Sequence, residues 1–199
     1  MSATPRTQAK ADRRDALLSA AASMFAERGF ERVSLDDLGG AVGVSGPAVY
    51  RHFSGKQAVL AALLVDTSEG LWQGGQRVVT EAADARAALS GLIDFHVDFA
   101  LANADVIRVQ DRDLDSLTET DRHRVRLLQR QYVELWVDVL ERVVEGEARP
   151  TLRTRAHAVF GLINSTPHSG RDRRSRDLLA TMALAALTAP SRTARTTAR

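Results

Sequence analysis

The sequence predicts an all-helical fold, and three observations support this prediction. Apolar residues recur at helical spacing along most of the 199-residue chain, as they do in helices that bury one face. Residues 48–149 contain no proline, and β-branched runs bounded by turn residues are missing, which argues against strands. Ser, Thr, Gly and Pro stand where helices would begin and end. We therefore expect about nine helices, in one compact domain or one domain with a small appendage.

The opening helix is expected over residues 11–28, where an apolar stripe runs along one side and Gly29 follows the last turn. A short second helix is expected over residues 35–42. Ser34 can cap its first turn, with Asp37 as the acidic partner of a capping box. These local signals predict both ends of two consecutive helices.

A glycine turn at Gly43 separates the second helix from the third. The third helix is expected from about residue 46 to residue 53, with Pro47 in the first turn, where its missing N–H costs nothing. Six further helices are expected. The first of these begins at residue 56, and Gly70, Gly74 and Gly75 leave the position of its end undefined. The others are expected over about residues 84–103, 105–117, 118–146, 150–166 and 174–188.

The composition excludes several classes of protein. The chain has no cysteine, so a disulfide scaffold, a CxxC metal site, a thiol nucleophile and an Fe–S cluster are all excluded. No apolar run approaches the roughly 18 residues of a membrane span, and the N-terminus has no apolar stretch typical of a secretion signal. We therefore expect a cytoplasmic protein with no membrane partner, no cofactor and no bound metal.

Positive charge is concentrated near the N-terminus, although the net charge of the chain is only +2. Residues 1–14 contain four basic residues and one acid, and residues 45–56 contain Arg51 and Lys56 and no acid. By contrast, residues 57–103 hold two arginines and six acids. This distribution is typical of an electrostatic footprint for nucleic acid, and a solvated basic tail is the alternative for the first residues.

Residues 34–60 have the spacing of a helix-turn-helix. Gly43 can adopt the positive φ of the turn, and Leu38, Val44 and Val49 can hold the two short helices at their crossing angle. Such a short pair is not stable alone, so the amphipathic helix before it is the expected brace. The second short helix then presents an outward face that carries no acid.

A motif in three parts runs through residues 12–64. It consists of AAASMFAERGFERVSLDDL, the core GVSGPAVYRHF and the lysine that begins the next helix. With these parts the chain resembles the TetR family of transcriptional regulators. The resemblance implies an N-terminal three-helix helix-turn-helix DNA-binding domain followed by a C-terminal helical ligand-binding and dimerisation domain. We accordingly divide the chain into a flexible basic arm (1–10), the DNA-binding domain (11–56), the ligand-binding and dimerisation domain (57–189) and a disordered tail (190–199).

The resemblance implies a homodimer whose two recognition helices enter successive major grooves of a palindromic double-stranded DNA operator, with half-site centres about 34–36 Å apart. Matching positions imply phosphate contacts by Ser34, Ser45, Tyr50, His52 and Lys56. They place Gly46, Pro47, Ala48 and Arg51 near base edges. Arg51 could read guanine O6 and N7 or lie on a phosphate. An ordinary three-helix core that binds no nucleic acid is the alternative for the whole segment.

Two glycines depart from the family pattern. The family usually has alanine at the position of Gly39 and often at that of Gly40. Each glycine inside a helix costs about 0.5–1 kcal/mol relative to alanine, so we expect a second helix of reduced rigidity.

The larger C-terminal part carries polar residues on otherwise apolar helix faces. A buried polar group needs a hydrogen-bond partner, and a ligand is one such partner. The candidate ligand-binding residues are Leu92, His96, Phe99, Asn103, Tyr132, Trp136, Phe160 and Asn164. A mostly apolar cavity with few polar groups would suit a small lipophilic or aromatic molecule or an acyl chain. The alternatives are a satisfied core histidine at His96 and plain core packing for Tyr132 and Trp136.

The last helix is apolar nearly all round, which indicates burial on more than one side. With the preceding helix and their twofold mates it would form a four-helix dimer interface. The candidate interface residues are Leu178, Leu179, Met182 and Ala186. Four arginines between residues 171 and 176 precede this helix, and we interpret them as a solvated or inter-subunit salt-bridging loop.

No catalytic constellation is found, and the chain is not expected to be an enzyme. A Gly-rich phosphate loop, a G-x-S-x-G elbow and an HExxH motif are missing from the sequence. Asp94 with Asp98, and Asp111 with Asp115, share helical faces and could ligate a metal, but ion pairing on solvated faces explains both pairs.

The predicted function is therefore a ligand-responsive DNA-binding regulator, most simply a repressor that a small molecule releases. The residues do not distinguish repression from activation. The alternative is a helical small-molecule-binding protein or enzyme with a vestigial DNA-binding head.

Overall fold

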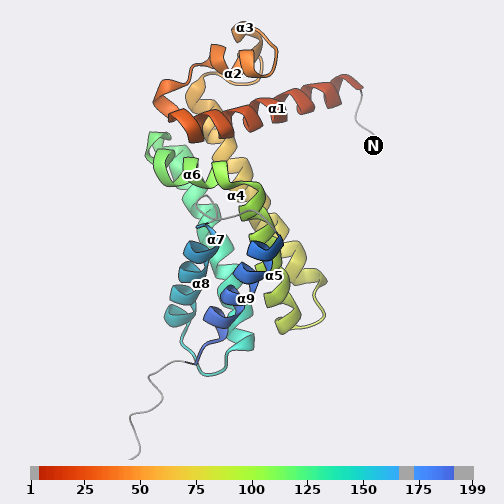
Figure 1. Ribbon diagram of the computed structural model, residues 1–199, viewed down its shortest axis with the longest axis vertical. Helices are drawn as coiled ribbons and strands as arrows, with labels where there is room; N and C mark the ends of the chain where they lie inside the picture. Colours follow the sequence, from red (N-terminus) through yellow and green to blue (C-terminus); the bar gives the residue numbers. More distant parts are fainter. Residues whose placement is uncertain (1–4, 166–172, 191–199) are drawn as a thin grey trace, which may run out of the picture. The chain divides into compact units, whose positions relative to one another are not determined.

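The computed structural model describes residues 5–165 and 173–190, and all regular structure within them is helical (Figure 1). The elements are α1 (Pro5–Arg28), a 3-10 turn η1 (Phe30–Arg32), α2 (Leu35–Ala41), α3 (Gly46–Val49), α4 (Lys56–Glu81), α5 (Ala85–Ala102), α6 (Ala104–Asp113), a 3-10 turn η2 (Leu114–Ser116), α7 (Glu119–Val143), α8 (Arg149–Ile163) and α9 (Arg173–Thr188). The all-α fold class and the order of the helices are confirmed. Among the described helices, none combines the length and the apolar character needed to cross a membrane.

Several predicted helix ends are confirmed by their hydrogen bonds. The Ser34 hydroxyl accepts from the N–H of Asp37 at 3.1 Å, and the Asp37 carboxylate accepts from the N–H of Ser34 at 2.8 Å. Thr118 caps α7 in the same way, accepting from the N–H of Asp121 at 3.1 Å. Gly29 follows α1 with a φ of 88°, a conformation that favours glycine. Local sequence signals therefore set these ends.

Other helix limits differ from the prediction. α1 begins at Pro5, so residues 5–10, predicted as part of a flexible arm, are helical. Proline is well tolerated in the first turn of a helix, which explains this early start. Regular α-helix in α3 ends at Val49 instead of near residue 53. The rest of the predicted arm and nearly all of the predicted tail lie outside the described residues.

The glycines of α4 do not end it, and two of them, Gly74 and Gly75, lie where other helices approach closely. A methyl group at Gly74 would lie 2.2 Å from the ring of Phe95, and one at Gly75 would lie 2.7 Å from the ring of Tyr132. These close contacts are possible only because glycine has no side chain. The packing that they allow outweighs the helix cost of about 0.5–1 kcal/mol for each glycine. α4 consequently continues to Glu81.

The described chain divides into two compact units. One is built from residues 5–70 and 103–129, and the other from residues 71–102, 130–165 and 173–190. These are units of packing, and the functional division between residues 56 and 57 stays a prediction.

In the first unit, α1 packs against α2, η1 and α6. Arg112 of α6 reaches the end of α1, where its guanidinium donates to the backbone carbonyls of Phe25 and Ala26. It also pairs with the buried carboxylate of Asp113 at 2.9 Å. A cation at these carbonyls satisfies acceptors that the helix leaves free and complements its dipole, so Arg112 joins α6 to α1.

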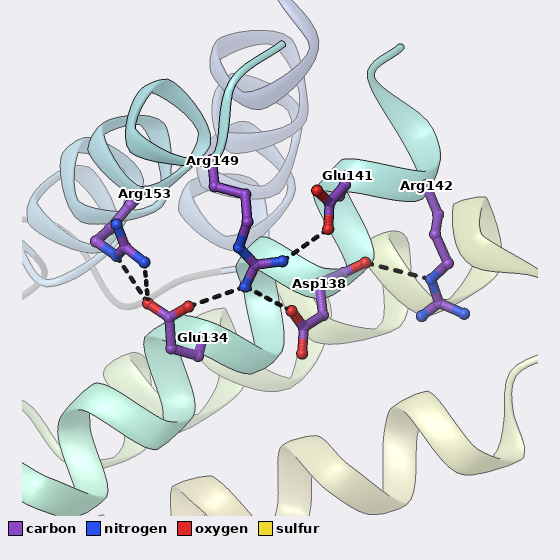
Figure 2. Close-up of polar contacts among 6 residues, drawn as sticks. All are labelled: Glu134, Asp138, Glu141, Arg142, Arg149 and Arg153. Atoms are coloured by element: carbon purple, nitrogen blue, oxygen red, sulfur yellow. Dashed lines mark hydrogen bonds and ion pairs between the residues drawn. The ribbon is translucent and has the colours of Figure 1, made fainter. Parts of the chain in front are cut away.

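In the second unit, α9 packs against α5 and α8, and ion pairs join α8 to α7. Figure 2 shows Arg149 between three carboxylates of α7, with donor–acceptor distances of 2.7 Å to Glu141, 2.8 Å to Asp138 and 3.0 Å to Glu134. Arg153 donates to Glu134 at 2.7 Å. These side chains are partly exposed, so solvent screens the pairs and each contributes little to stability. Arg149 and Arg153 are therefore engaged in ion pairs within the chain.

Gly40→Ala is expected to raise the free energy of unfolding by about 0.5–1 kcal/mol. Gly40 is exposed in α2, and no atom lies within 4 Å of the place its methyl group would take. Gly39→Ala is the matched control and is not expected to stabilise, because its methyl group would lie 2.8 Å from the carbonyl oxygen of Val44 and 3.1 Å from Val49. Urea unfolding measures both. Equal stabilisation by the two variants would contradict the tight contact at Gly39.

Candidate nucleic-acid interface and ligand site

The helix-turn-helix is held together by a buried apolar contact and a tight turn. Leu38 of α2 and Val49 of α3 are fully buried. Gly43 has a φ of 70°, and the N–H of Val44 donates to the carbonyl of Gly39 at 2.9 Å. The predicted glycine turn and the contribution of Leu38 and Val49 are confirmed, while Val44 is only half-buried.

α3 and the turn after it form a short outward face. The N–H groups of His52 and Phe53 both donate to the carbonyl of Val49, at 2.9 and 3.1 Å, so the helical path continues past the regular helix. The exposed residues of this face are Ser45, Pro47, Tyr50 and Arg51, and the half-buried ones are Ala48 and His52. Tyr50 is 61% exposed, which is unusual for a large aromatic residue. We call these six residues the α3 face.

Gly46 does not belong to the α3 face, although the sequence predicts it near base edges. It is buried, and a methyl group there would lie 1.7 Å from Oδ1 of Asp36 in α2. The carboxylate of Asp36 therefore covers Gly46 and places an acid beside a surface expected to have none. Asp36 belongs to the preceding helix, so the sequence of the recognition segment gives no signal for this contact.

Two predicted phosphate contacts are engaged within the chain. The Ser34 hydroxyl donates its only proton to Asp37 at 2.6 Å, so it has no proton left for a phosphate oxygen. Lys56 Nζ donates to the carbonyls of Phe30 and Glu31 at 2.9 and 3.1 Å and lies 4.4 Å from the centre of the Phe30 ring. Lys56 thus ties the start of α4 to η1, and one N–H of its ammonium group remains beyond these two bonds.

An open groove of about 450 Å³ adjoins the α3 face. It is lined by residues 31–36 together with Tyr50, Gly55 and Lys56. Arg32 is exposed in this lining, and the sequence reasoning did not single it out. The groove brings Tyr50, Arg32 and Lys56 to one surface, which is a set of donors suited to phosphate oxygens.

The second candidate site is a cluster of rings from α5, α7 and α8 around His96, which we call the aromatic cluster. The centre of the His96 ring lies 4.8 Å from that of Phe160, 5.7 Å from Tyr132, and 6.0 Å from both Phe99 and Trp136. His96 and Tyr132 are buried and Trp136 is completely so, while Phe160 is half-buried.

The polar atoms of this cluster are incompletely paired. Tyr132 Oη lies 3.3 Å from His96 Nδ1. Three other buried atoms have no partner at strict hydrogen-bonding geometry among the described residues, namely His96 Nε2, Trp136 Nε1 and Asn164 Oδ1. The Asn164 side chain still lies close enough to His96, and that of Trp136 close enough to Tyr132, to shift the pKa values of these two neighbours through weak hydrogen bonding. Burial lowers the pKa of His96 to about 4, and the Asn164 side chain opposes this shift. Burial raises the pKa of Tyr132, so both side chains are uncharged near neutral pH.

The structure brings together most of the candidate ligand-binding residues. His96, Phe99, Tyr132, Trp136 and Phe160 share ring contacts, and Asn164 acts on His96. Leu92 is fully buried on α5, one turn before His96. Asn103 belongs to the other compact unit, where it precedes α6. His96 Nδ1 has Tyr132 as a partner, whereas Nε2 has none at strict hydrogen-bonding geometry among the described residues, so the core and ligand-binding interpretations of His96 both stay open.

The exposed side of α9 is apolar. Leu178 is 57% exposed and Met182 is 45% exposed, and Ala186 is exposed one turn further on. Leu179, also predicted at the interface, is buried within its own chain, because it lies on the side of α9 that packs against α5 and α8. Leu178, Met182 and Ala186 therefore form the stripe that a second copy could cover.

Arg176 pairs within the chain. It lies 2.6 Å from Asp98 and 3.2 Å from Asp94 on α5, so both acids of one suspected metal pair are engaged in an ion pair. In the other suspected pair, Asp115 is paired with Arg122 at 3.4 Å. The other arginines of the loop before α9 lie outside the residues whose side chains are described, apart from Arg174, which is exposed.

Comparisons with known protein families match two regions of the chain. The model of bacterial regulatory proteins of the tetR family matches residues 17–63, which contain the helix-turn-helix. A model of tetracyclin repressor-like C-terminal domains matches residues 82–168, which contain the aromatic cluster.

Individual proteins give the same result. The HTH-type transcriptional repressor KstR2 of Mycolicibacterium smegmatis is 32% identical over 71% of this chain and 70% of its own length. The structure of the ketosteroid transcriptional regulator KstR2 of Mycobacterium tuberculosis has a TM-score of 0.75 at 19% identity, covering 88% of this chain and 93% of that one. FadR of Bacillus subtilis, solved in complex with stearoyl-CoA, has a TM-score of 0.72 at 15% identity over 88% of this chain and 98% of its own.

Proposed function

Because this chain belongs to the tetR family of bacterial transcriptional regulators, we propose that it is a homodimeric repressor of a palindromic DNA operator. A small, largely apolar ligand bound at the aromatic cluster releases it from the DNA. The observation that carries the DNA-binding part is the α3 face, where Tyr50 and Arg51 are exposed on a turn held by the buried contact between Leu38 and Val49.

On DNA, the α3 face lies in the major groove and the groove beside it follows the phosphate backbone. Ser45, Tyr50, His52 and Arg32 donate to phosphate oxygens, which positions the protein without reading sequence. Pro47 and Ala48 are small enough for close approach to base edges, and Arg51 reads guanine or binds phosphate. Ser34 and Gly46 have no part in this proposal, because one is engaged in capping and the other is covered by Asp36.

The ligand part is supported by the composition of the aromatic cluster and by two relatives of the same fold. The cluster offers buried rings and a few polar atoms, which is typical of sites for small apolar molecules. The names of the two structures refer to ketosteroid regulation in KstR2 and to stearoyl-CoA bound to FadR, and we propose a lipophilic or acyl ligand for this chain. Occupancy of the site would change the separation of the two DNA-reading heads.

A gel-shift experiment tests the DNA-binding proposal. The full chain is titrated against duplex fragments from upstream of its own gene and the neighbouring genes. We expect salt-dependent binding to at least one fragment and weaker binding by Tyr50→Ala, with helix content unchanged by circular dichroism. If no duplex is bound at any salt concentration, the head is vestigial and the chain is a helical small-molecule-binding protein or an enzyme.

Met182→Glu is expected to convert the homodimer to a monomer. Met182 is exposed in the apolar stripe of α9, and a dimer that covers this stripe would bury the new carboxylate without a partner, which is costly. Light scattering after size-exclusion chromatography measures the mass. Gln76→Glu, which adds the same charge at an exposed position of α4, is expected to leave the dimer intact. A dimer that survives in Met182→Glu would place the interface elsewhere.

A further inference from the structure

We infer that the aromatic cluster takes an uncharged ligand that places a carbonyl or hydroxyl oxygen against Trp136 Nε1 and His96 Nε2, and that it rejects a carboxylate at this position. The inference depends on the proposed ligand site and goes further by naming the chemical group that the site recognises.

The three unpartnered atoms define what the ligand must offer. Trp136 Nε1 can only donate and Asn164 Oδ1 can only accept, while His96 Nε2 does either, according to its tautomer. All three are buried without a partner at bonding geometry, and such atoms are costly to leave unpaired. A carbonyl oxygen can accept from Trp136, and a hydroxyl can accept from Trp136 and also donate to Asn164.

The same cluster offers nothing to balance a negative charge. His96 is neutral because burial lowers its pKa to about 4, and the other members are aromatic rings and an amide. Charged side chains of these helices are engaged in ion pairs elsewhere: Asp94 and Asp98 of α5 pair with Arg176 of α9, and Arg153 of α8 pairs with Glu134 of α7. A carboxylate would therefore lose its hydration without gaining a cation.

The rings suit a compact apolar skeleton. Tyr132 and Phe160 are nearly parallel, with an angle of 11° and a distance of 5.7 Å between ring centres, and Trp136 stands edge-on to Phe160 at 5.0 Å. Phe99 and Phe160 are half-buried, so these two rings are the part of the cluster that solvent or a ligand reaches.

Four probes with one carbon skeleton test the inference, namely decalin, decalone, decalol and decalincarboxylate. The full chain with Trp72→Phe retains Trp136 as its single tryptophan, since the sequence has two. Its fluorescence reports binding at the cluster, and titration calorimetry gives the affinities. We expect decalone and decalol to bind about tenfold more tightly than decalin, the gain of one neutral hydrogen bond. Decalincarboxylate is expected to bind at least about tenfold more weakly than decalone.

Two variants test which protein atoms form hydrogen bonds with the ligand oxygen. Trp136→Phe, measured by calorimetry, keeps a ring and removes the donor, so decalone affinity is expected to fall about tenfold to that of decalin, which itself stays unchanged. Asn164→Leu removes the acceptor and is expected to weaken decalol while sparing decalone. If Trp136→Phe fails to fold, Asn164→Leu still tests the acceptor: decalol affinity that is unchanged in this variant would contradict the inference.

Carboxylate binding as tight as that of decalone would overturn the inference, as would an equal loss of decalin affinity in Trp136→Phe. Binding of none of the four probes up to their solubility limits would also overturn it. Operator binding is measured on the same samples. A protein that binds DNA and fails these tests refutes the ligand chemistry alone, whereas one that binds no DNA refutes the proposed repressor.

Discussion

Arg51→Ala is expected to weaken operator binding by about 1–3 kcal/mol for each half-site, or roughly 5-fold to 150-fold per half-site. Arg51 is exposed on the α3 face next to Tyr50, where a guanidinium can reach either a guanine or a phosphate. If it reads guanine, the loss is specific to one base pair in each half-site. If it binds a phosphate, all sequences weaken alike and the salt slope falls by about one for each half-site.

Fluorescence anisotropy with the operator and its single-base variants, over a range of salt concentrations, separates these two outcomes. Arg130→Ala is the matched control, since it removes the same charge from an exposed position of α7. We expect it to leave affinity nearly unchanged. An equal loss in both variants would indicate a general charge effect, and unchanged affinity in Arg51→Ala would remove this residue from the interface.

The stability of the folded chain is expected to fall by about 3 kcal/mol through His96 alone when the pH is lowered from about 7 to about 4. Burial depresses the pKa of His96 from 6.5 to about 4. Between these values the unfolded chain binds a proton that the folded chain does not, so protonation favours unfolding. The contribution of His96 is fully present above pH 6.5 and is lost as the pH falls toward 4.

Urea unfolding of wild type and His96→Phe across this pH range isolates the effect. Carboxylate titrations are common to both proteins and cancel in the difference. The variant keeps a ring in the aromatic cluster, and its stability is expected to depend less steeply on pH. His157→Asn, at an exposed position of α8, is expected to retain the wild-type profile. If the stability of His96→Phe depends on pH as steeply as that of wild type, folding does not lower the pKa of His96, and the prediction is wrong.

The fold was largely predictable because its signals are local. Ser34 with Asp37 and Thr118 with Asp121 specify helix starts within four residues of chain, and their hydrogen bonds are present. The turn at Gly43 is equally local, since it depends on the one residue type that adopts a positive φ readily.

The remaining features depend on contacts between distant residues, which periodicity does not reveal. In the sequence, Gly75 is typical of a helix end. In the structure, the ring of Tyr132 occupies the space that a side chain at Gly75 would take. The sequence indicates that Lys56 is free to bind phosphate. In the structure, two of its N–H groups donate to the carbonyls of Phe30 and Glu31.

The same limit explains α9 and the aromatic cluster. A helix that is apolar all round does not show which side faces its own core, so Leu179 could not be separated from its neighbours. In the cluster, the sequence nominated polar residues that the structure brings together, but it could not show which of their atoms lack a partner.

Operator recognition by this protein requires two α3 faces that contact DNA as a symmetric pair. Hydroxyl-radical footprinting of the full chain on its operator fragment measures this. Two protected patches on one face of the duplex are predicted, with centres about 34–36 Å apart, and both are expected to fade with added salt and in Arg51→Ala. A footprint that is unchanged in Arg51→Ala, or the lack of any salt-dependent protection on every fragment, would contradict the account.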